Sequence, residues 1–153
     1  MVTIFNKGGS ATLFISEKNK KTSLKEFILY IGITAFIILF SFVYESCSHG
    51  VMSNAMIFAF LYPLLMGVSV YAALYFIPFK YVPGYLTSSI YNLGVALFTS
   101  RSIFIGVLEI YGKTNSKMLL TYTILAIVVY IAGVILMAYS LIKGNLKKEE
   151  AKA

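Results

Sequence analysis

The chain has 153 residues, of which 59% are hydrophobic and 12% are charged, and its 13 Lys and Arg exceed its six Asp and Glu to give a net charge of +7. Soluble domains usually carry about a quarter of charged residues, so this composition excludes an ordinary soluble protein. We predict an all-α, polytopic integral membrane protein, built as a bundle of four transmembrane helices in the lipid bilayer of the cell membrane.

Residues 1–26 are polar and rich in Lys, and we predict that they form a basic cytoplasmic tail. Two short apolar stretches flank Asn6-Lys7-Gly8-Gly9 within it, a turn-rich spacing that is typical of a small hairpin. A surface segment or an unstructured arm is the alternative, because an isolated two-stranded hairpin is only marginally stable.

The transmembrane domain is predicted over residues 27–142, because it contains four apolar runs close to the ~20 residues that cross a hydrocarbon core. We place the four spans at residues 27–44, 52–77, 85–108 and 118–142. Pro63 lies within the second span and predicts a kink near residues 59–62, because proline removes a backbone donor and clashes with the preceding turn.

Small residues recur along two of these spans and predict faces on which another helix can approach closely. They are Ala55, Ala59, Pro63 and Gly67 in the second span, and Ala126, Gly133 and Ser140 in the fourth. The heptad spacing in the fourth span favours a left-handed helix crossing. Residues 143–153 follow as a second basic cytoplasmic tail, which we expect to fray.

The distribution of Lys and Arg predicts the orientation of the chain. Ten of the 13 lie in the two tails and at Lys80, between the second and third spans, whereas the opposite loops hold only Lys113 and Lys117. Because positive charge marks the cytoplasmic side, we predict that both termini are cytoplasmic. No aromatic platform is interleaved with these lysines, so we predict no nucleic-acid partner.

Arg101 lies inside the predicted third span, where a cation is costly and is usually paired or functional. Glu109, Glu45 and His49 are the candidate partners, although Glu109 lies about 12 Å further along the helix. One interpretation is a structural ion pair, or an arginine that reaches the outer interface. The alternative is an anion or substrate-carboxylate site, or part of an ion path.

A polar stripe runs along one face of the predicted third span. Its members are Ser88, Asn92, Thr99 and Ser102, with Gly106 and Glu109 further along. At 100° per residue, Arg101 projects roughly 140° from the middle of this stripe, so the two features should contact different neighbours. We expect the stripe to hydrogen-bond other helices, and a hydrated pathway is the alternative.

Cys47 and His49, close to Glu45, are candidates for a metal or proton-sensing site on the outer side. A single Cys and a single His exclude an internal disulfide, and haem held between two histidines of this chain. We therefore predict no metal and no cofactor. The chain has no phosphate-binding glycine loop, no Ser/His/Asp set and no HExxH motif, so we also predict that it is not an enzyme.

Most of the chain is membrane domain, and its small-residue faces suit helix association. We predict an accessory or interaction subunit of a membrane assembly, with helices of other membrane proteins or further copies of the chain as partners. The alternative is a small oligomeric transporter or channel that uses Arg101 and the polar stripe.

Overall fold

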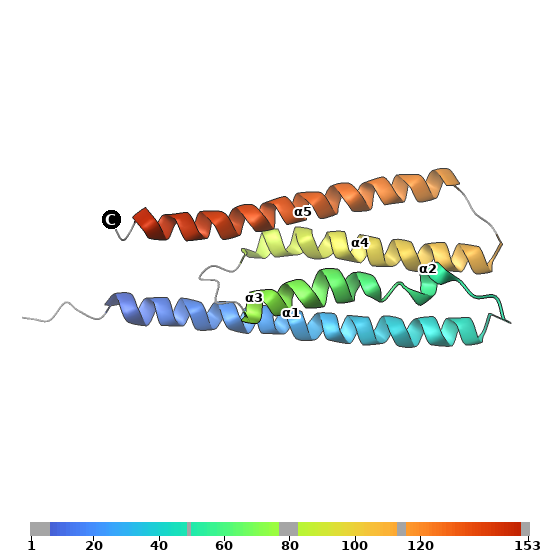
Figure 1. The fold of residues 1–153 in the computed structure, drawn as a ribbon, viewed down its shortest axis with the longest axis horizontal. Helices are drawn as coiled ribbons and strands as arrows, with labels where there is room; N and C mark the ends of the chain where they lie inside the picture. The colour runs from blue at the N-terminus through green and yellow to red at the C-terminus, as the bar shows by residue number, and fades with distance from the viewer. Residues whose placement is uncertain (1–6, 49, 77–82, 113–115, 151–153) are drawn as a thin grey trace, which may run out of the picture.

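The computed structural model describes residues 7–48, 50–76, 83–112 and 116–150, and every regular element among them is helical. The elements are α1 (Lys7–Ser46), α2 (Asn54–Ile57), the π-helix η1 (Pro63–Val68), α3 (Ser69–Phe76), α4 (Tyr85–Ile110) and α5 (Ser116–Glu150). They run alternately up and down, so α1 begins and α5 ends at the same end of the molecule (Figure 1). The all-helical prediction is confirmed for the described residues.

Among the described residues, three helices are long and apolar enough to cross a membrane by length and composition. The candidate spans are Lys21–Ser46, Tyr85–Ile110 and Lys117–Lys143, and a shorter apolar helix covers Pro63–Phe76. The three long spans include all of the first, third and fourth predicted spans. The short helix has about 21 Å of rise, which is less than the roughly 30 Å hydrocarbon core.

The second predicted span is not one continuous helix, which corrects the expectation for residues 52–77. It is a broken segment (residues 54–76) in which the short α2 is followed by a turn at residues 58–60 and then by η1 and α3. Pro63 accounts for the break, because a proline ring cannot donate to the carbonyl four residues earlier and clashes with it. The disruption expected near residues 59–62 is therefore present, as a break rather than a kink. Residues 77–82 lie outside the described part of the chain.

The two tails also differ from expectation. The described part of the first tail, from Lys7 onward, continues α1 without interruption, so the small hairpin is not formed there. At the other end of the chain, α5 continues to Glu150. The polar stretches beside the spans contain many Lys and Glu, which are good helix formers. Extending a helix that already exists avoids the cost of nucleation. Residues 1–6 and 151–153 lie outside the described residues.

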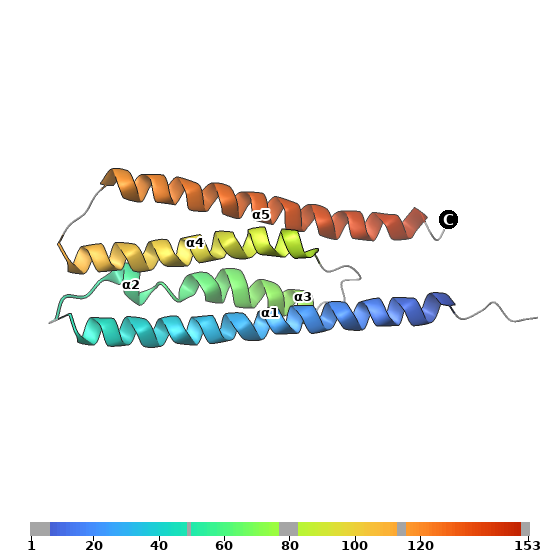
Figure 2. The ribbon, with the colours of Figure 1, turned by 180° about the vertical axis from the view of Figure 1, so that it is seen from behind.

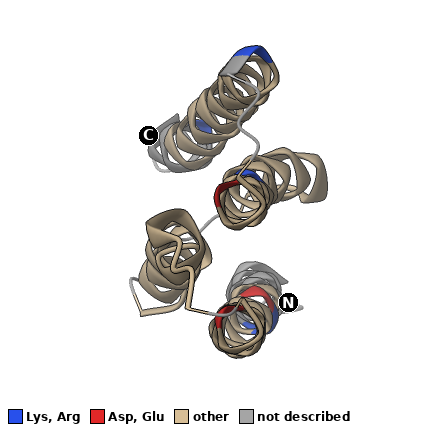
Figure 3. Ribbon diagram, turned by 90° about the vertical axis from the view of Figure 1, so that its right-hand side faces the viewer, with Lys and Arg blue, Asp and Glu red and all other residues tan. Residues whose placement is uncertain are grey.

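The helices form a staggered row rather than a closed ring. Seen end-on, α1 lies at one end of the row and α5 at the other, with the broken segment and α4 between them (Figure 3). The view from behind gives the same order (Figure 2). Among the described elements, α5 closely approaches only α4, whereas α1 packs along the broken segment.

An aromatic cluster crosses this row and forms much of its core. The rings of Tyr30 and Tyr71 stack at 5.5 Å, Tyr71 meets Tyr91 edge-on at 6.3 Å, and Tyr91 lies 5.6 Å from Tyr130. These four tyrosines come from α1, α3, α4 and α5 respectively. Burial of the large rings therefore holds every segment of the row to its neighbour.

Candidate functional site

Asn92 on α4 is the centre of a polar network that joins three segments. The hydroxyl groups of Tyr30 and Tyr71 both donate to its Oδ1 atom, at 2.9 and 2.8 Å. Its Nδ2 group donates to Oε2 of Glu26 at 3.2 Å. Both ends of the amide are therefore bonded, and α4 is tied to α1 and to α3 at one level.

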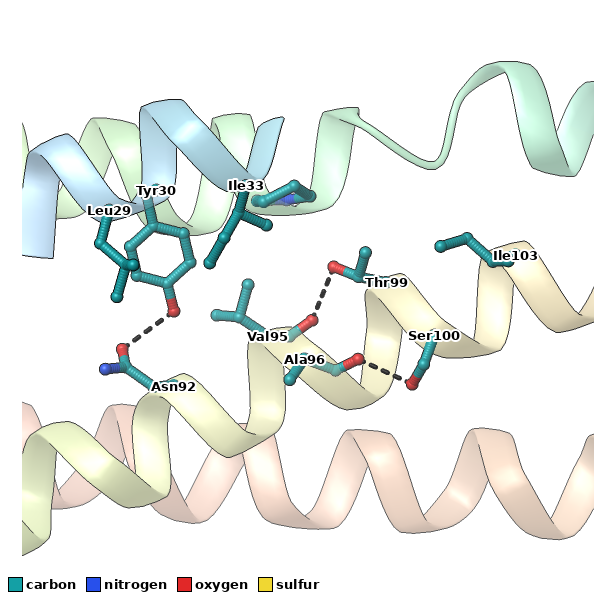
Figure 4. A pocket seen from close by; sticks show the side chains of 10 residues that line it. Leu29, Tyr30, Ile33, Asn92, Val95, Ala96, Thr99, Ser100 and Ile103 are labelled. Carbon is teal, nitrogen blue, oxygen red and sulfur yellow. Dashed lines mark hydrogen bonds between the residues drawn. The ribbon is translucent and has the colours of Figure 1, made fainter. Parts of the chain in front are cut away.

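A cavity of about 340 Å³ lies beside this network, between α1 and α4. Tyr30 and Asn92 lie at one end of it, and apolar side chains including Leu29, Ile33 and Ile103 line much of the rest (Figure 4). The hydroxyl of Thr99 is directed to the carbonyl of Val95 on its own helix, at 2.9 Å. The cavity thus offers an apolar wall with one polar end and has no free charge at its centre.

Arg101 lies on a different side of α4, half-buried. Its Nε group donates to the Thr123 hydroxyl on α5 at 2.6 Å, and Thr123 in turn donates to the carbonyl of Leu119 at 2.6 Å. Within the described part of the chain the guanidinium forms no ion pair. Arg101 also lines a second cavity, of about 370 Å³, between α4 and the broken segment.

The predicted pairing of Arg101 with Glu109 or Glu45 is not formed. Both carboxylates instead accept bonds from Ser53: the hydroxyl donates to Glu109 at 2.5 Å and the backbone N–H donates to Glu45 at 3.3 Å. Ser53 is the N-cap of α2, and its hydroxyl also accepts from Met56 N. Ser53 therefore supplies a donor to each carboxylate, its hydroxyl to Glu109 and its backbone N–H to Glu45.

The polar stripe contacts α1 and the broken segment. Asn92 bonds the two tyrosines, and the buried Ser102 donates to the carbonyl of Ala55 at 2.6 Å. Gly106 packs against Met56 so closely that a Cβ atom there would lie 2.6 Å from the Met56 Cβ. Ser88, half-buried, lies one helical turn before Asn92. Arg101 instead donates to Thr123 on α5, although it lines the cavity beside the broken segment together with Ser102.

The structure describes Cys47 but not His49, the two candidates for a metal or proton-sensing site. Cys47 is a free, exposed thiol just beyond α1, and His49 lies outside the described residues. No group of three His, Cys, Asp or Glu side chains that could hold a metal is found where the structure describes the chain. The arrangement expected at Glu45, Cys47 and His49 stays a prediction.

Sequence reasoning missed Glu26, which it placed at the end of a solvated tail. Glu26 and Tyr30 are four residues apart and therefore share one face of α1. That spacing was a usable signal, since a carboxylate and a phenol on one face of a membrane helix need partners. Their common partner, Asn92, depends on how the helices pack, which periodicity does not reveal.

Comparison of the chain with protein-family models, with curated proteins and with solved structures found no match.

Proposed function

We propose that this chain is an accessory or interaction subunit of a membrane assembly that crosses the cell membrane four times, with both termini in the cytoplasm. The observation that carries this proposal is the open row: α5 closely approaches only α4 among the described elements. A row of helices encloses no path of its own, and its two outer helices offer long apolar faces. Such faces suit association with other membrane helices.

The broken segment is the second of the four crossings in this topology. Residues 54–76 run back alongside α1, and they connect the end of the row that holds Ser53 to the end where α4 begins (Figure 1). A broken helix is tolerated at membrane depth when neighbouring groups satisfy its backbone. Here the Ser41 hydroxyl donates to the carbonyl of Met56. The Ser102 hydroxyl donates to the carbonyl of Ala55. Ten of the 13 Lys and Arg then fall on the cytoplasmic side.

The single exposed thiol makes this topology testable. An impermeant maleimide should label Cys47 on intact cells, because the α1–α2 connection is then outside. In Cys47→Ser variants that also carry Val2→Cys or Ala153→Cys, labelling should require permeabilised cells. Labelling of either terminus in intact cells would contradict the proposed orientation.

The assembly role predicts what is recovered from native membranes. After purification of the tagged chain in a mild detergent, we expect a larger complex that contains a second polypeptide in a fixed ratio. Recovery only as a homogeneous homo-oligomer would contradict an accessory role. Solute flux through liposomes that hold this chain alone, altered by Arg101→Ala, would establish the transporter alternative instead.

A further inference from the structure

We propose that the groove beside Arg101, which is the cavity of about 370 Å³ lined by α4 and the broken segment, binds a transmembrane helix of a different polypeptide that carries one Asp or Glu at the level of the guanidinium. This inference rests on the proposed accessory role and names the chemistry of the partner. Arg101 is half-buried within a span. Its guanidinium donates to the Thr123 hydroxyl but has no carboxylate partner among the described residues.

The depth of Arg101 favours a counter-charge. Arg101 lies about 5 Å of helix rise from the middle of α4, and roughly 14 Å from the end at Ile110. Side chains on a helix lean toward its N-terminus, which here turns Arg101 away from that end. The Nε bond to Thr123 holds the side chain against α5. A cation placed in hydrocarbon in this way is usually paired with an anion.

The groove has walls that suit a helix. The broken segment and α5 both pack on α4 and do not closely approach each other, so Arg101 lies on the α4 surface between them. Phe98 lies one turn away on this surface, stacked on Tyr62 at 5.7 Å and edge-on to Tyr130 at 5.6 Å. Phe58 and Leu65, which line the groove, are 52% and 62% exposed. An apolar helix would cover these side chains and deliver one carboxylate to the guanidinium.

A second copy of this chain does not supply that carboxylate. Its six acidic residues are Glu17, Glu26, Glu45, Glu109, Glu149 and Glu150. Glu45 and Glu109 lie at one end of the spans, about 12 Å of helix rise from the level of Arg101. Glu26 lies near the opposite end, about 28 Å from Glu45 along α1. Two copies in the same orientation would therefore leave Arg101 unpaired, which favours a partner of different sequence.

Designed peptides test this pairing directly. The probe is a Leu-rich transmembrane peptide with one Glu at the level of Arg101, compared with peptides that carry Gln at that position or Glu at the membrane interface. Association with the purified full-length chain in phosphatidylcholine vesicles is measured by energy transfer to a label on Cys47. We expect the Glu peptide to bind about tenfold more tightly than either control peptide.

Variants assign the preference to Arg101. Arg101→Gln should abolish the preference for the Glu peptide over the Gln peptide, whereas Thr123→Val should retain this preference. Lys117→Gln is the matched control, because it removes a cation that lies outside the groove. Arg101→Glu should prefer a Lys peptide, so the pairing stays testable if Arg101→Gln does not fold. Equal binding of the Glu and Gln peptides, or a preference that survives Arg101→Gln, would overturn the inference.

Two further outcomes separate this inference from others. Binding of oleate that depends on Arg101, without any peptide preference, would overturn it in favour of a lipophilic carboxylate. If the native hetero-complex persists while the peptide preference is absent, the accessory role stands and only the charge pairing fails. If peptides pair with Arg101 but native membranes yield a homogeneous homo-oligomer, the accessory role fails instead.

Discussion

The two sides of α4 are held by different means. On the α5 side the helices approach through glycine: a Cβ atom on Gly94 would lie 2.7 Å from the Cα of Tyr130, and one on Gly133 would lie 2.7 Å from the Cα of Tyr91. Ala126 of α5 is fully buried. The polar contacts on this side join side chains: Ser100 contacts the Tyr122 hydroxyl, and Arg101 donates to Thr123.

On the other side, α4 donates hydrogen bonds to the backbone of its neighbour. Ser102 donates to the carbonyl of Ala55, and Tyr91 donates to the carbonyl of Met66 in the π-helix. The reason lies in the break: Ala59 N donates to the carbonyl of Met56 rather than to that of Ala55. The Ala55 carbonyl therefore needs a donor from elsewhere.

The two neighbours of α4 have different requirements for association in a membrane. A regular helix satisfies its own backbone, so α5 needs only a close-fitting surface. A broken segment leaves backbone groups that hydrocarbon cannot satisfy, so its neighbours must supply donors. Ser102 is the member of the polar stripe that meets this need, because its hydroxyl donates to the Ala55 carbonyl.

The largest expected effect is at the α4–α5 contact. Gly94→Ala places a methyl group against the Tyr130 backbone, so α5 must move, and we expect a loss of about 3 kcal/mol in the free energy of unfolding. Steric trapping in bicelles measures this value. Gly32→Ala adds the same methyl group where nothing lies within 4 Å, and should leave stability unchanged or slightly raised. Similar losses at Gly94 and Gly32 would contradict the close approach.

The next effect is at the polar network. Asn92→Ala removes the amide bonded to Tyr30, Tyr71 and Glu26, and we expect a loss of about 2 kcal/mol, since such bonds in membranes contribute roughly 0.6 kcal/mol on average and unpaired polar groups remain. A double-mutant cycle with Tyr30→Phe should give non-additive losses of stability. Strict additivity would show that the two side chains do not interact.

The regular helices were predictable because hydropathy reports on them directly. The predicted start of the third span at Tyr85 is the start of α4, and Pro63 indicated where the second span would be disrupted. Hydropathy does not report backbone geometry, however. Residues 58–60 are as apolar as their neighbours, so the turn there has no compositional signal.

The candidate site was less predictable because it depends on which residues of distant segments meet. Angular projection on one helix placed Arg101 away from the middle of the polar stripe, and this needed only the helical period. The partners of Glu45 and Glu109 depend on Ser53, which caps a helix that exists only because the second span is broken. Charge alone suggested Arg101 as the partner of these two carboxylates, whereas Ser53 is the residue that bonds them.

The smallest effect compares two serines of α4 that lie two residues apart. Ser102→Ala leaves the Ala55 carbonyl without the hydroxyl that donates to it, and we expect a loss of about 1 kcal/mol in the free energy of unfolding. Ser100→Ala removes an exposed contact with the Tyr122 hydroxyl on α5, and its effect should stay within about 0.5 kcal/mol. Both variants are measured by steric trapping under the same conditions. Equal losses would mean that the broken backbone has no special need for a donor from α4, and the two sides of the helix would then differ only in their partners.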